Sequence, residues 1–454
     1  MSALIEQWRA GGREVAVVGF GKSGLAASRL LRQHGVAVYA SDGGDGPRAE
    51  AQAVQLRGYG AEAQVGGHDL LRIARAVAVV TAPGVPPDVP ALTAARAAGV
   101  PILAEVDLGL TALPAQTRVI GITGTNGKTT TTSLVAHVLS AAGRRAGTAG
   151  NIGTALCDVA ADGTAPEWLV LELSSFQLHD CPHLVPWLGV LTNLAPNHLD
   201  RYHSLRDYYG DKALLFANAH AGSISIANAD QPAVVAMMAP VPGRQLRFST
   251  RTRADGWYDT DARALMLDDV RVCTRDELPL LGDHNVQNAL VAALVAREAG
   301  LTAAEIAAGF RTFRAIPHRV EPVRTVGEVL WINDSKSTNV TSTEVAITAL
   351  DRPFVLLLGG RHKGEPYGRL IPLLQGRCRA VIAYGESAPL VTADLAAAVP
   401  VVQGGTVFPA ILAQAAMLAQ AGDAVLLSPA CSSYDMFDNY EQRGDQFRAL
   451  VEAL

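Results

Sequence analysis

The sequence predicts an α/β protein of three successive domains. The chain has 454 residues, which is too many for one ordinary hydrophobic core. Short apolar runs of strand type alternate with stretches of helical periodicity, an order typical of parallel sheets covered by helices. Two glycine-rich loops, at residues 19–24 and 123–129, each lie between such a run and a helix. These three observations together indicate the fold class.

The first domain is expected over residues 1–107. Residues 15–19 form an apolar run, a glycine loop follows, and a helical pattern continues to about residue 34. Further strands are expected at residues 36–40 and 77–81. This alternation predicts a parallel, doubly wound sheet.

The second and third domains are expected over residues 108–315 and 316–454. Both repeat the alternation of strands and helices, and the helix after the second glycine loop is expected at residues 129–142. The polar, turn-rich stretch at residues 243–281 predicts a small β insertion or subdomain. The strands expected in these two domains are residues 119–123, 168–173, 188–193, 329–332, 354–358, 380–384 and 424–427.

Composition and charge argue against several classes of protein. The formal net charge is −5, whereas nucleic-acid binders normally carry a basic patch or stripe. No run approaches the roughly 20 apolar residues that span a bilayer, and the first residues lack the order of a signal peptide. The five cysteines are scattered and form no CxxC pair. This usage favours reduced thiols in a cytoplasmic protein.

The first glycine loop has the pattern Gly19-x-Gly21-x-x-Gly24, with Asp42 about twenty residues further on. Glycines allow the backbone to approach a diphosphate, and the following helix offers free N–H groups to it. A nicotinamide dinucleotide and a UDP-sugar both satisfy this requirement. Glycines that serve only helix–strand packing are the third interpretation.

The second glycine loop, Gly124-Thr-Asn-Gly127-Lys128-Thr129, also follows a strand and opens a helix. Its backbone N–H groups would surround phosphates, Lys128 would neutralise the terminal ones, and the Thr129 hydroxyl would bind Mg²⁺. The loop is shorter than the general Walker pattern, because no glycine stands five positions before Gly127. It indicates a nucleotide triphosphate site.

Three further side chains follow strands of the second domain and are candidate ligands of metal or substrate. Glu172 ends one apolar run, and His198 and Asp200 follow another. In a parallel sheet such positions face the phosphate loop. A solvated strand end for Glu172 and a structural role for His198 are the alternative interpretations.

Several motifs together resemble the Mur ligases of peptidoglycan synthesis. They are Thr-Gly-Thr-Asn-Gly-Lys-Thr-Thr at 123–130, Glu-Leu-Ser-Ser-Phe-Gln at 172–177, Asn-His-Leu-Asp-Arg at 197–201, Asn-Asp-Ser-Lys-Ser-Thr-Asn at 333–339, Leu-Leu-Gly-Gly-Arg-His-Lys-Gly at 357–364, Leu-Ser-Pro-Ala-Cys-Ser-Ser-Tyr-Asp-Met-Phe at 427–437 and Tyr-Glu-Gln-Arg-Gly at 440–444. The resemblance covers nearly the whole chain in order. It favours the branch of the family that joins D-glutamate to UDP-N-acetylmuramoyl-L-alanine.

This resemblance implies a Rossmann-like UDP-binding domain, a central P-loop ATPase domain and a C-terminal Rossmann-like domain that binds D-glutamate and closes over ATP. It implies that ATP phosphorylates the free carboxylate and that the amine of D-glutamate attacks the acyl phosphate. Two anions must meet in this step, so ATP and Mg²⁺ are the expected cofactors. The expected state is a monomer that takes no nucleic acid and does not insert into a membrane.

The resemblance also assigns roles to residues. The expected catalytic residues are Lys128, Glu172, His198, Lys212 and Lys336, and the metal ligands are Thr129, Glu172, His198 and a carbamylated Lys212. The expected ATP contacts are Gly124, Thr125, Asn126, Gly127, Lys128, Thr129, Thr130, Asn285, Asn288, Arg319 and Asp334. The expected UDP-substrate contacts are Gly21, Lys22, Ser23, Asp42, Pro83, Gly84, Asn151 and His198. The expected D-glutamate contacts are Thr338, Lys363, Ser433, Tyr434 and Tyr440.

Other functions remain alternatives at this point. An NAD-dependent oxidoreductase would use the first loop but leave Lys128, Glu172 and His198 without a purpose. A nucleotide-regulated binding protein would have no ligase activity. Within the same reaction class, a sister ligase for another amino acid and folylpolyglutamate synthase are the nearer alternatives.

Overall fold

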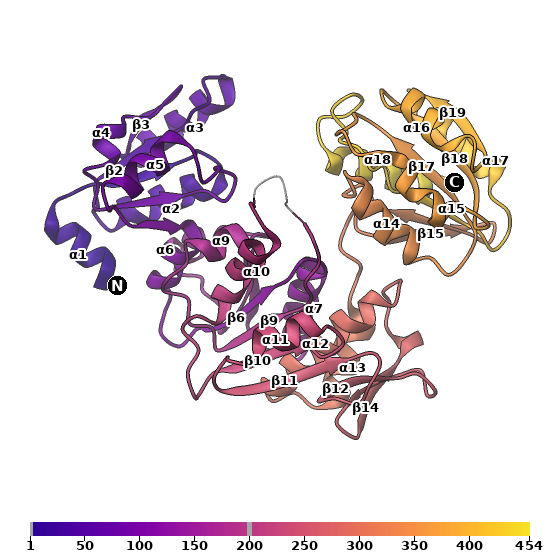
Figure 1. Ribbon diagram of the computed structural model, residues 1–454, viewed down its shortest axis with the longest axis horizontal. Coiled ribbons are helices and arrows are strands. Elements are labelled where there is room, and N and C mark those ends of the chain that lie inside the picture. Colours follow the sequence, from indigo (N-terminus) through magenta and orange to yellow (C-terminus); the bar gives the residue numbers. More distant parts are fainter. Residues whose placement is uncertain (1–2, 198–201) are drawn as a thin grey trace. The chain divides into compact units, whose positions relative to one another are not determined.

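The computed structural model describes residues 3–197 and 202–454, and in these residues the chain forms three β-sheets (Figure 1). The chain divides into two compact units. One contains Met1–Leu278 and Val286–Phe313, and the other contains Pro279–Asn285 and Arg314–Leu454. The first unit carries the first two sheets, and the second unit carries the third sheet.

The first sheet is parallel throughout and has the strand order β3-β2-β1-β4-β5. The predicted alternation of strands and helices is confirmed here. The glycine loop lies between the central strand β1 and helix α2. The bounds are β1 Val15–Val18, β2 Val38–Ser41, β3 Glu62–Gln64, β4 Ala78–Thr81 and β5 Ile102–Ala104, with α1 Ala3–Gly11, α2 Lys22–Gln33, α3 Pro47–Gly58, α4 Leu70–Ile73, α5 Pro90–Ala97 and α6 Glu105–Ala112.

The second sheet has the order β14-β13-β12-β11-β10-β9-β6-β8-β7. Its strands are parallel from β7 to β12, whereas β13 and β14 are antiparallel additions. The bounds of its strands are β6 Arg118–Thr123, β7 Ala146–Gly150, β8 Trp168–Glu172, β9 Leu188–Leu191, β10 Ile224–Asn228, β11 Arg244–Ser249, β12 Gly256–Asp259, β13 Ala264–Leu267 and β14 Val270–Thr274. The helices are α7 Lys128–Ala141, α8 Leu156–Ala161, α9 Ser175–His179, α10 Leu205–Ala213, α11 Pro232–Met238, α12 His284–Glu298 and α13 Ala303–Thr312.

The polar stretch predicted as a small β part forms strands β11 to β14. These strands continue the central sheet and do not form a separate subdomain. The many turn residues of this stretch suggested a separate unit. The pairing of β11 with β10 instead makes these strands part of the central sheet.

Helix α8 joins the first two sheets into one unit. Cys157 of α8 is fully buried in the same hydrophobic cluster as Val15 of β1 and Leu108 of α6. On the surface of this contact, Arg29 of α2 pairs with Asp158 at 3.3 Å and also with Asp162. The domain boundary expected at residue 107 falls within α6, and the functional domain limits stay a prediction.

The third sheet has the order β15-β16-β20-β17-β18-β19, parallel except for the β15–β16 pair. Its buried strands pack against helices on both faces, which gives the two apolar clusters of this unit. The bounds are β15 Glu321–Val326, β16 Val329–Asn333, β17 Phe354–Gly359, β18 Cys378–Tyr384, β19 Val401–Gly405 and β20 Ala424–Leu427, with α14 Val340–Thr348, α15 Ile371–Leu374, α16 Ala388–Leu395, α17 Phe408–Leu418 and α18 Tyr440–Glu452.

Two further observations concern the whole described chain. Among the described residues, no helix is both long and apolar enough to cross a membrane. All five cysteines lie in this part of the chain and are free thiols.

Candidate active site

The second glycine loop connects β6 to α7 at the carboxyl end of the central strands. Gly124 and Gly127 both have positive φ, at 147° and 78°. A Cβ atom would lie 2.0 Å from Thr192 Oγ1 at Gly124 and 2.4 Å from Asn288 Oδ1 at Gly127. Both glycines are therefore required by backbone conformation and by close neighbours.

The residues after β9 hold this loop in place. The Asn126 N–H donates to Asn193 Oδ1 at 2.8 Å, and Asn193 Nδ2 donates to the Asn126 carbonyl at 2.9 Å. Thr125 exchanges hydrogen bonds of 3.0 and 3.1 Å with the backbone of Ala195. On the other side of the loop, Asn288 of α12 accepts from Thr131 at 3.0 Å. The loop is thus fixed in shape, as a phosphate cradle requires.

Two lysines converge on the loop. Lys128 Nζ donates to the carbonyls of Gly124 and Thr125 at 3.0 and 2.8 Å, and Lys212 Nζ donates to the Gly124 carbonyl at 2.8 Å. Lys212 lies on α10, is 1% exposed, and lies 4.5 Å from the centre of the Tyr208 ring. Burial, and then the charge of Lys128, lower the pKa of Lys212 to about 7.

Glu172 ends β8 beside the loop and is 2% exposed. Its Oε1 accepts from Asn151 Nδ2 at 2.7 Å, and its Oε2 is buried without a hydrogen-bond partner among the described residues. The Asn151 N–H also donates to the Glu172 carbonyl at 2.9 Å. Asn151 is therefore placed beside the carboxylate. A buried carboxylate oxygen that lacks a donor suits a cation.

The fit of Mg²⁺ to this region rests on Glu172 and on the hydroxyl of Thr129 in the first turn of α7, because a carboxylate and a hydroxyl are ligand types that Mg²⁺ accepts. His198 and Asp200 lie outside the described residues, so their positions stay predictions. Among the residues that the structure describes, no group of three or more His, Cys, Asp or Glu side chains could hold a metal ion.

The first glycine loop borders a cavity of about 550 Å³. A Cβ atom at Gly24 would lie 1.9 Å from the Gly19 carbonyl, so this glycine permits the close approach of helix and strand. Asp42 accepts from the N–H groups of Phe20 and Gly44 at 2.7 and 2.8 Å. The predicted UDP contacts that line this cavity are Gly21, Lys22, Ser23, Asp42, Pro83 and Gly84.

A second cavity, of about 340 Å³, lies between the end of β4 and the helices α9 and α10. Its wall contains the stacked rings of Phe176 and Tyr202, whose centres are 5.6 Å apart. His179 and Tyr202 both bond to Asp211, at 2.9 and 2.8 Å, and the Asp211 carboxylate raises the pKa of His179. Both cavities are lined by Ala82, Pro83 and Val85.

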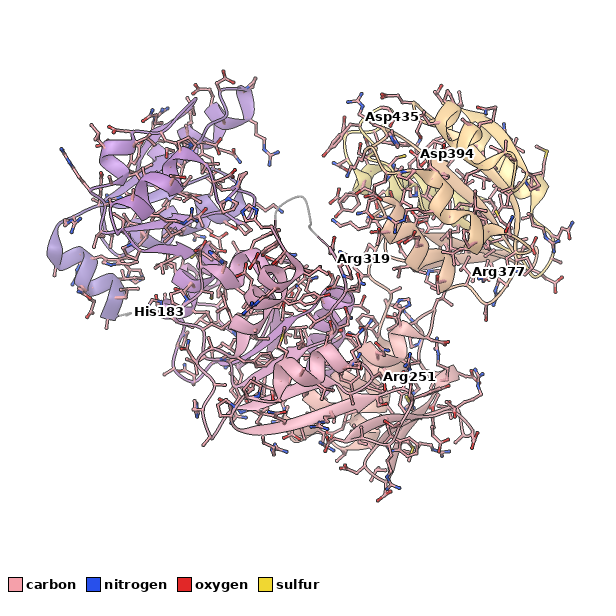
Figure 2. All side chains as sticks on the ribbon, in the orientation of Figure 1. His183, Arg251, Arg319, Arg377, Asp394 and Asp435 are labelled. Atoms are coloured by element: carbon pink, nitrogen blue, oxygen red, sulfur yellow. The ribbon has the colours of Figure 1, made fainter. Side chains whose placement is uncertain are left out.

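In the other unit, the predicted nucleotide residues Arg319 and Asp334 lie near the ends of β16 and β20. Asp334 accepts from the Val320 N–H at 3.1 Å and from Ser428 Oγ at 2.7 Å. Burial raises its pKa to about 6, and the nearby charge of Arg319, which Figure 2 labels, opposes this shift. Lys336 Nζ lies 3.9 Å from the centre of the Tyr440 ring.

Of the predicted D-glutamate residues, the structure brings Thr338 and Lys363 together. Lys363 Nζ donates to Thr338 Oγ1 at 3.2 Å. Ser433 is buried and Tyr434 is 65% exposed, both in the segment after β20.

Asn285, a predicted ATP contact, donates to the Leu281 carbonyl at 2.6 Å. The role of each of these residues stays a prediction.

Sequence reasoning missed several residues that shape these sites. Asn193 and Thr192 fix the phosphate loop, Tyr208 faces Lys212, and His68 lines the larger cavity. Asn193 and Thr192 could have been found, because they directly follow a strand whose end faces the loop. His68 follows a strand of three residues that has no periodic signal.

Comparisons with known proteins agree with this arrangement. Three domain families match in order: the Mur ligase MurD-like N-terminal domain at residues 13–104, the Mur ligase middle domain at 122–296, and the Mur ligase glutamate ligase domain at 318–431. Two solved structures share the fold. MurC of Thermotoga maritima and MurF of Acinetobacter baumannii each align with a TM-score of 0.61, at 17% and 16% identity. They cover 97% and 100% of this chain, and 99% and 98% of their own chains align.

Relatives of higher identity span nearly the whole chain. The UDP-N-acetylmuramoylalanine–D-glutamate ligase of Acidobacterium capsulatum is 40% identical, over 97% of this chain and 96% of its own. The proteins of the same name from Myxococcus xanthus and Salinibacter ruber are 39% and 40% identical, over 98% and 96% of this chain and 99% and 97% of their own. The chain therefore belongs to the Mur ligase family and groups there with the UDP-N-acetylmuramoylalanine–D-glutamate ligases.

Proposed function

We propose that this protein is an ATP-dependent ligase that adds D-glutamate to UDP-N-acetylmuramoyl-L-alanine in cytoplasmic peptidoglycan precursor synthesis. The relatives named above carry this activity in their names. The observation that supports it best is the fixed phosphate loop. There Lys128 and Lys212 both donate to the Gly124 carbonyl, and one oxygen of the buried Glu172 has no donor among the described residues.

The two adjoining cavities described above suit an extended substrate. The first glycine loop offers the N-terminus of α2 and Lys22 to a diphosphate. The adjoining cavity offers stacked rings and polar side chains, a wall typical of sugar and acyl groups. Because both cavities are lined by Ala82, Pro83 and Val85, a UDP-sugar would extend from the first loop toward the central sheet.

The proposed reaction first makes the carboxylate a good electrophile. A carboxylate oxygen attacks the γ-phosphorus, ADP leaves, and the amine of D-glutamate then attacks the acyl carbon. Phosphate leaves with one former carboxylate oxygen, and the amine loses a proton. Lys128 would reduce the repulsion between ATP and the carboxylate. Mg²⁺ bound by Thr129 and Glu172 would supply further neutralisation of phosphate charge.

Lys212 is proposed to act as a carbamate. An amine whose pKa is lowered to about 7 is partly neutral at physiological pH. The nitrogen of a neutral amine can bond to the carbon of CO₂ and release a proton, and the resulting carbamate carries anionic oxygens that can bind a metal ion. Such a group would change a repulsive pair of lysines into an attractive one.

Recognition of D-glutamate is assigned to the third sheet. The ammonium of Lys363 and the hydroxyl of Thr338 lie 3.2 Å apart and can bind one carboxylate together. Ser433, Tyr434 and Tyr440 are the further proposed contacts.

The test is phosphate release across a panel of UDP-muramoyl substrates and amino acids. We expect release only when UDP-N-acetylmuramoyl-L-alanine, D-glutamate and ATP are all present. A stronger response to L-lysine or to meso-diaminopimelate on another UDP substrate would instead identify a sister ligase. Hydride transfer to NAD⁺ without phosphate release would contradict the proposal.

A further inference from the structure

An imidazole lies in the wall of the larger cavity, outside every motif of the sequence. His68 follows β3 in the turn Gly66-Gly67-His68 and lines the cavity with Asp42 and Gly43. A Cβ atom at Gly43 would lie 3.8 Å from His68 Nε2, so this edge of the ring lies beside Gly43. Nε2 has no hydrogen-bond partner among the described residues, whereas Nδ1 has one.

One hydrogen bond holds the ring, and others hold the backbone on both sides of His68. His68 Nδ1 lies 2.9 Å from Ser41 Oγ at the end of β2. The N–H groups of Gly66 and Gly67 donate to the carbonyls of Gly44 and Asp42 at 2.9 and 3.0 Å. The next residue, Asp69, donates its N–H to the Tyr39 hydroxyl at 2.8 Å. The imidazole is therefore oriented without a ligand, which reduces the entropy that binding would cost.

The position of His68 indicates which end of a nucleotide it meets. The diphosphate belongs at the glycine loop and at the start of α2, where Lys22 lies. In this type of fold the nucleoside extends toward the end of the second strand, which is where Ser41 and His68 lie. Both carboxylate oxygens of Asp42 already accept backbone N–H groups. His68 lines the cavity at this end, and its Nε2 keeps its hydrogen-bonding capacity for a ligand.

The charge state of the ring agrees with a nucleoside contact. Burial lowers the pKa of His68, although the carboxylate of Asp42 opposes the shift. A neutral imidazole makes directional hydrogen bonds to carbonyl, N–H or hydroxyl groups and is a poor partner for a diphosphate.

We propose that His68 is a specificity-determining residue that hydrogen-bonds the uridine end of the UDP-substrate through Nε2, while Ser41 holds Nδ1. This assignment rests on the proposed function, because it takes the ligand of the cavity to be a UDP-sugar. His68 would thus be a contact to the nucleoside in addition to the glycine motif and Asp42.

The test is calorimetric binding of UDP and of inorganic pyrophosphate to the full chain. We expect His68→Ala to weaken UDP binding about tenfold, the loss of one good hydrogen bond, and to leave pyrophosphate binding unchanged. His68→Gln, which keeps an N–H donor, should recover part of the UDP affinity. The matched control is His34→Ala, at the end of α2 and outside the cavity lining, which should bind UDP like the wild type.

The possible outcomes separate this proposal from the function on which it rests. Wild-type protein that fails to bind UDP would overturn both. Wild-type protein that binds UDP, with a His68→Ala variant of equal affinity, would overturn the role of His68 alone. An equal loss of UDP and pyrophosphate affinity would overturn the assignment to the nucleoside. If His68→Ala loses its cooperative thermal transition, His68→Gln is compared with the wild type instead. The proposal then predicts weaker binding of UDP and unchanged binding of pyrophosphate by His68→Gln, and equal affinity of the two proteins for UDP would overturn it.

Discussion

The two glycine loops of the first unit both connect a parallel strand to a helix, but the charged side chains around them differ. Each follows a parallel strand, and each is followed by a helix that begins at a lysine, Lys22 for α2 and Lys128 for α7. Around the first loop, Asp42 is bonded to backbone N–H groups. Around the second, Lys212 and Glu172 are buried side chains of opposite charge type. The same motif thus suits binding in one place and phosphoryl transfer in the other, according to the neighbouring strand ends.

The largest expected difference comes from exchanging the two lysines for alanine, one at a time. Lys128→Ala should reduce the turnover number about 10³-fold, because the proposed role of this cation is to neutralise charge where ATP and the carboxylate meet. Lys22→Ala is the matched variant and should mainly raise the KM for the UDP-substrate. Steady-state phosphate release measures both. Equal losses of turnover in the two variants would remove the distinction between the loops.

A second variant concerns the buried lysine beside the second loop. Lys212→Ala should lower the turnover number roughly 10²-fold, because the anionic oxygens of the proposed carbamate would be lost. Formate or acetate should restore part of the activity by supplying a carboxylate in the space left. The same acids should not rescue Lys128→Ala, which serves as the control. Full activity of Lys212→Ala without any added acid would exclude the residue from the reaction.

A buried carboxyl group, that of Glu105, lies near Ser23 in the helix that follows the first loop. Glu105 is 1% exposed, accepts from the Cys157 N–H at 2.6 Å, and keeps Oε2 without a hydrogen-bond partner in the described part of the chain. Burial raises its pKa from 4.5 to about 7. The folded protein then binds this proton more tightly than the unfolded chain, so stability falls as the pH rises from about 4.5 to about 7.

Glu105→Gln should remove this loss of stability. A pKa difference of that size corresponds to about 3 kcal/mol, so the variant should be more stable than wild type by up to that amount at pH 8. At pH 4.5 the two proteins should differ little. Urea unfolding at both pH values measures the effect, and a difference that does not change with pH would contradict the raised pKa.

The smallest expected effect concerns the glycines themselves. Gly24→Ala should destabilise the first unit by about 2 kcal/mol, because the added methyl group would press on the Gly19 carbonyl. Gly21→Ala is the control, since nothing lies within 4 Å of its Cβ position. Thermal unfolding of both variants measures the difference. Equal stability would mean that the strand and helix of the first loop can separate without cost.

Much of this comparison could be predicted from the sequence, and the rest depends on pairing between distant residues. The apolar runs before both glycine loops are confirmed as β1 and β6, since continuous apolar residues mark buried parallel strands. Strand β7, Ala146–Gly150, was missed because alanine, glycine and threonine give no strand pattern, and its pairing with β8 determines it. His68 and Asn193 were missed for a similar reason. Their neighbours, Ser41 and Asn126, are 27 and 67 residues away in the sequence.

The transfer of isotope from the substrate carboxylate to phosphate tests the central claim most directly. UDP-N-acetylmuramoyl-L-alanine labelled with ¹⁸O in its carboxylate would be converted with ATP and D-glutamate, and the phosphate analysed by mass spectrometry. Activation through an acyl phosphate predicts one ¹⁸O atom in each phosphate released, because the carboxylate oxygen that attacks the γ-phosphorus leaves with it. Phosphate without ¹⁸O, formed together with the amide product, would contradict the account.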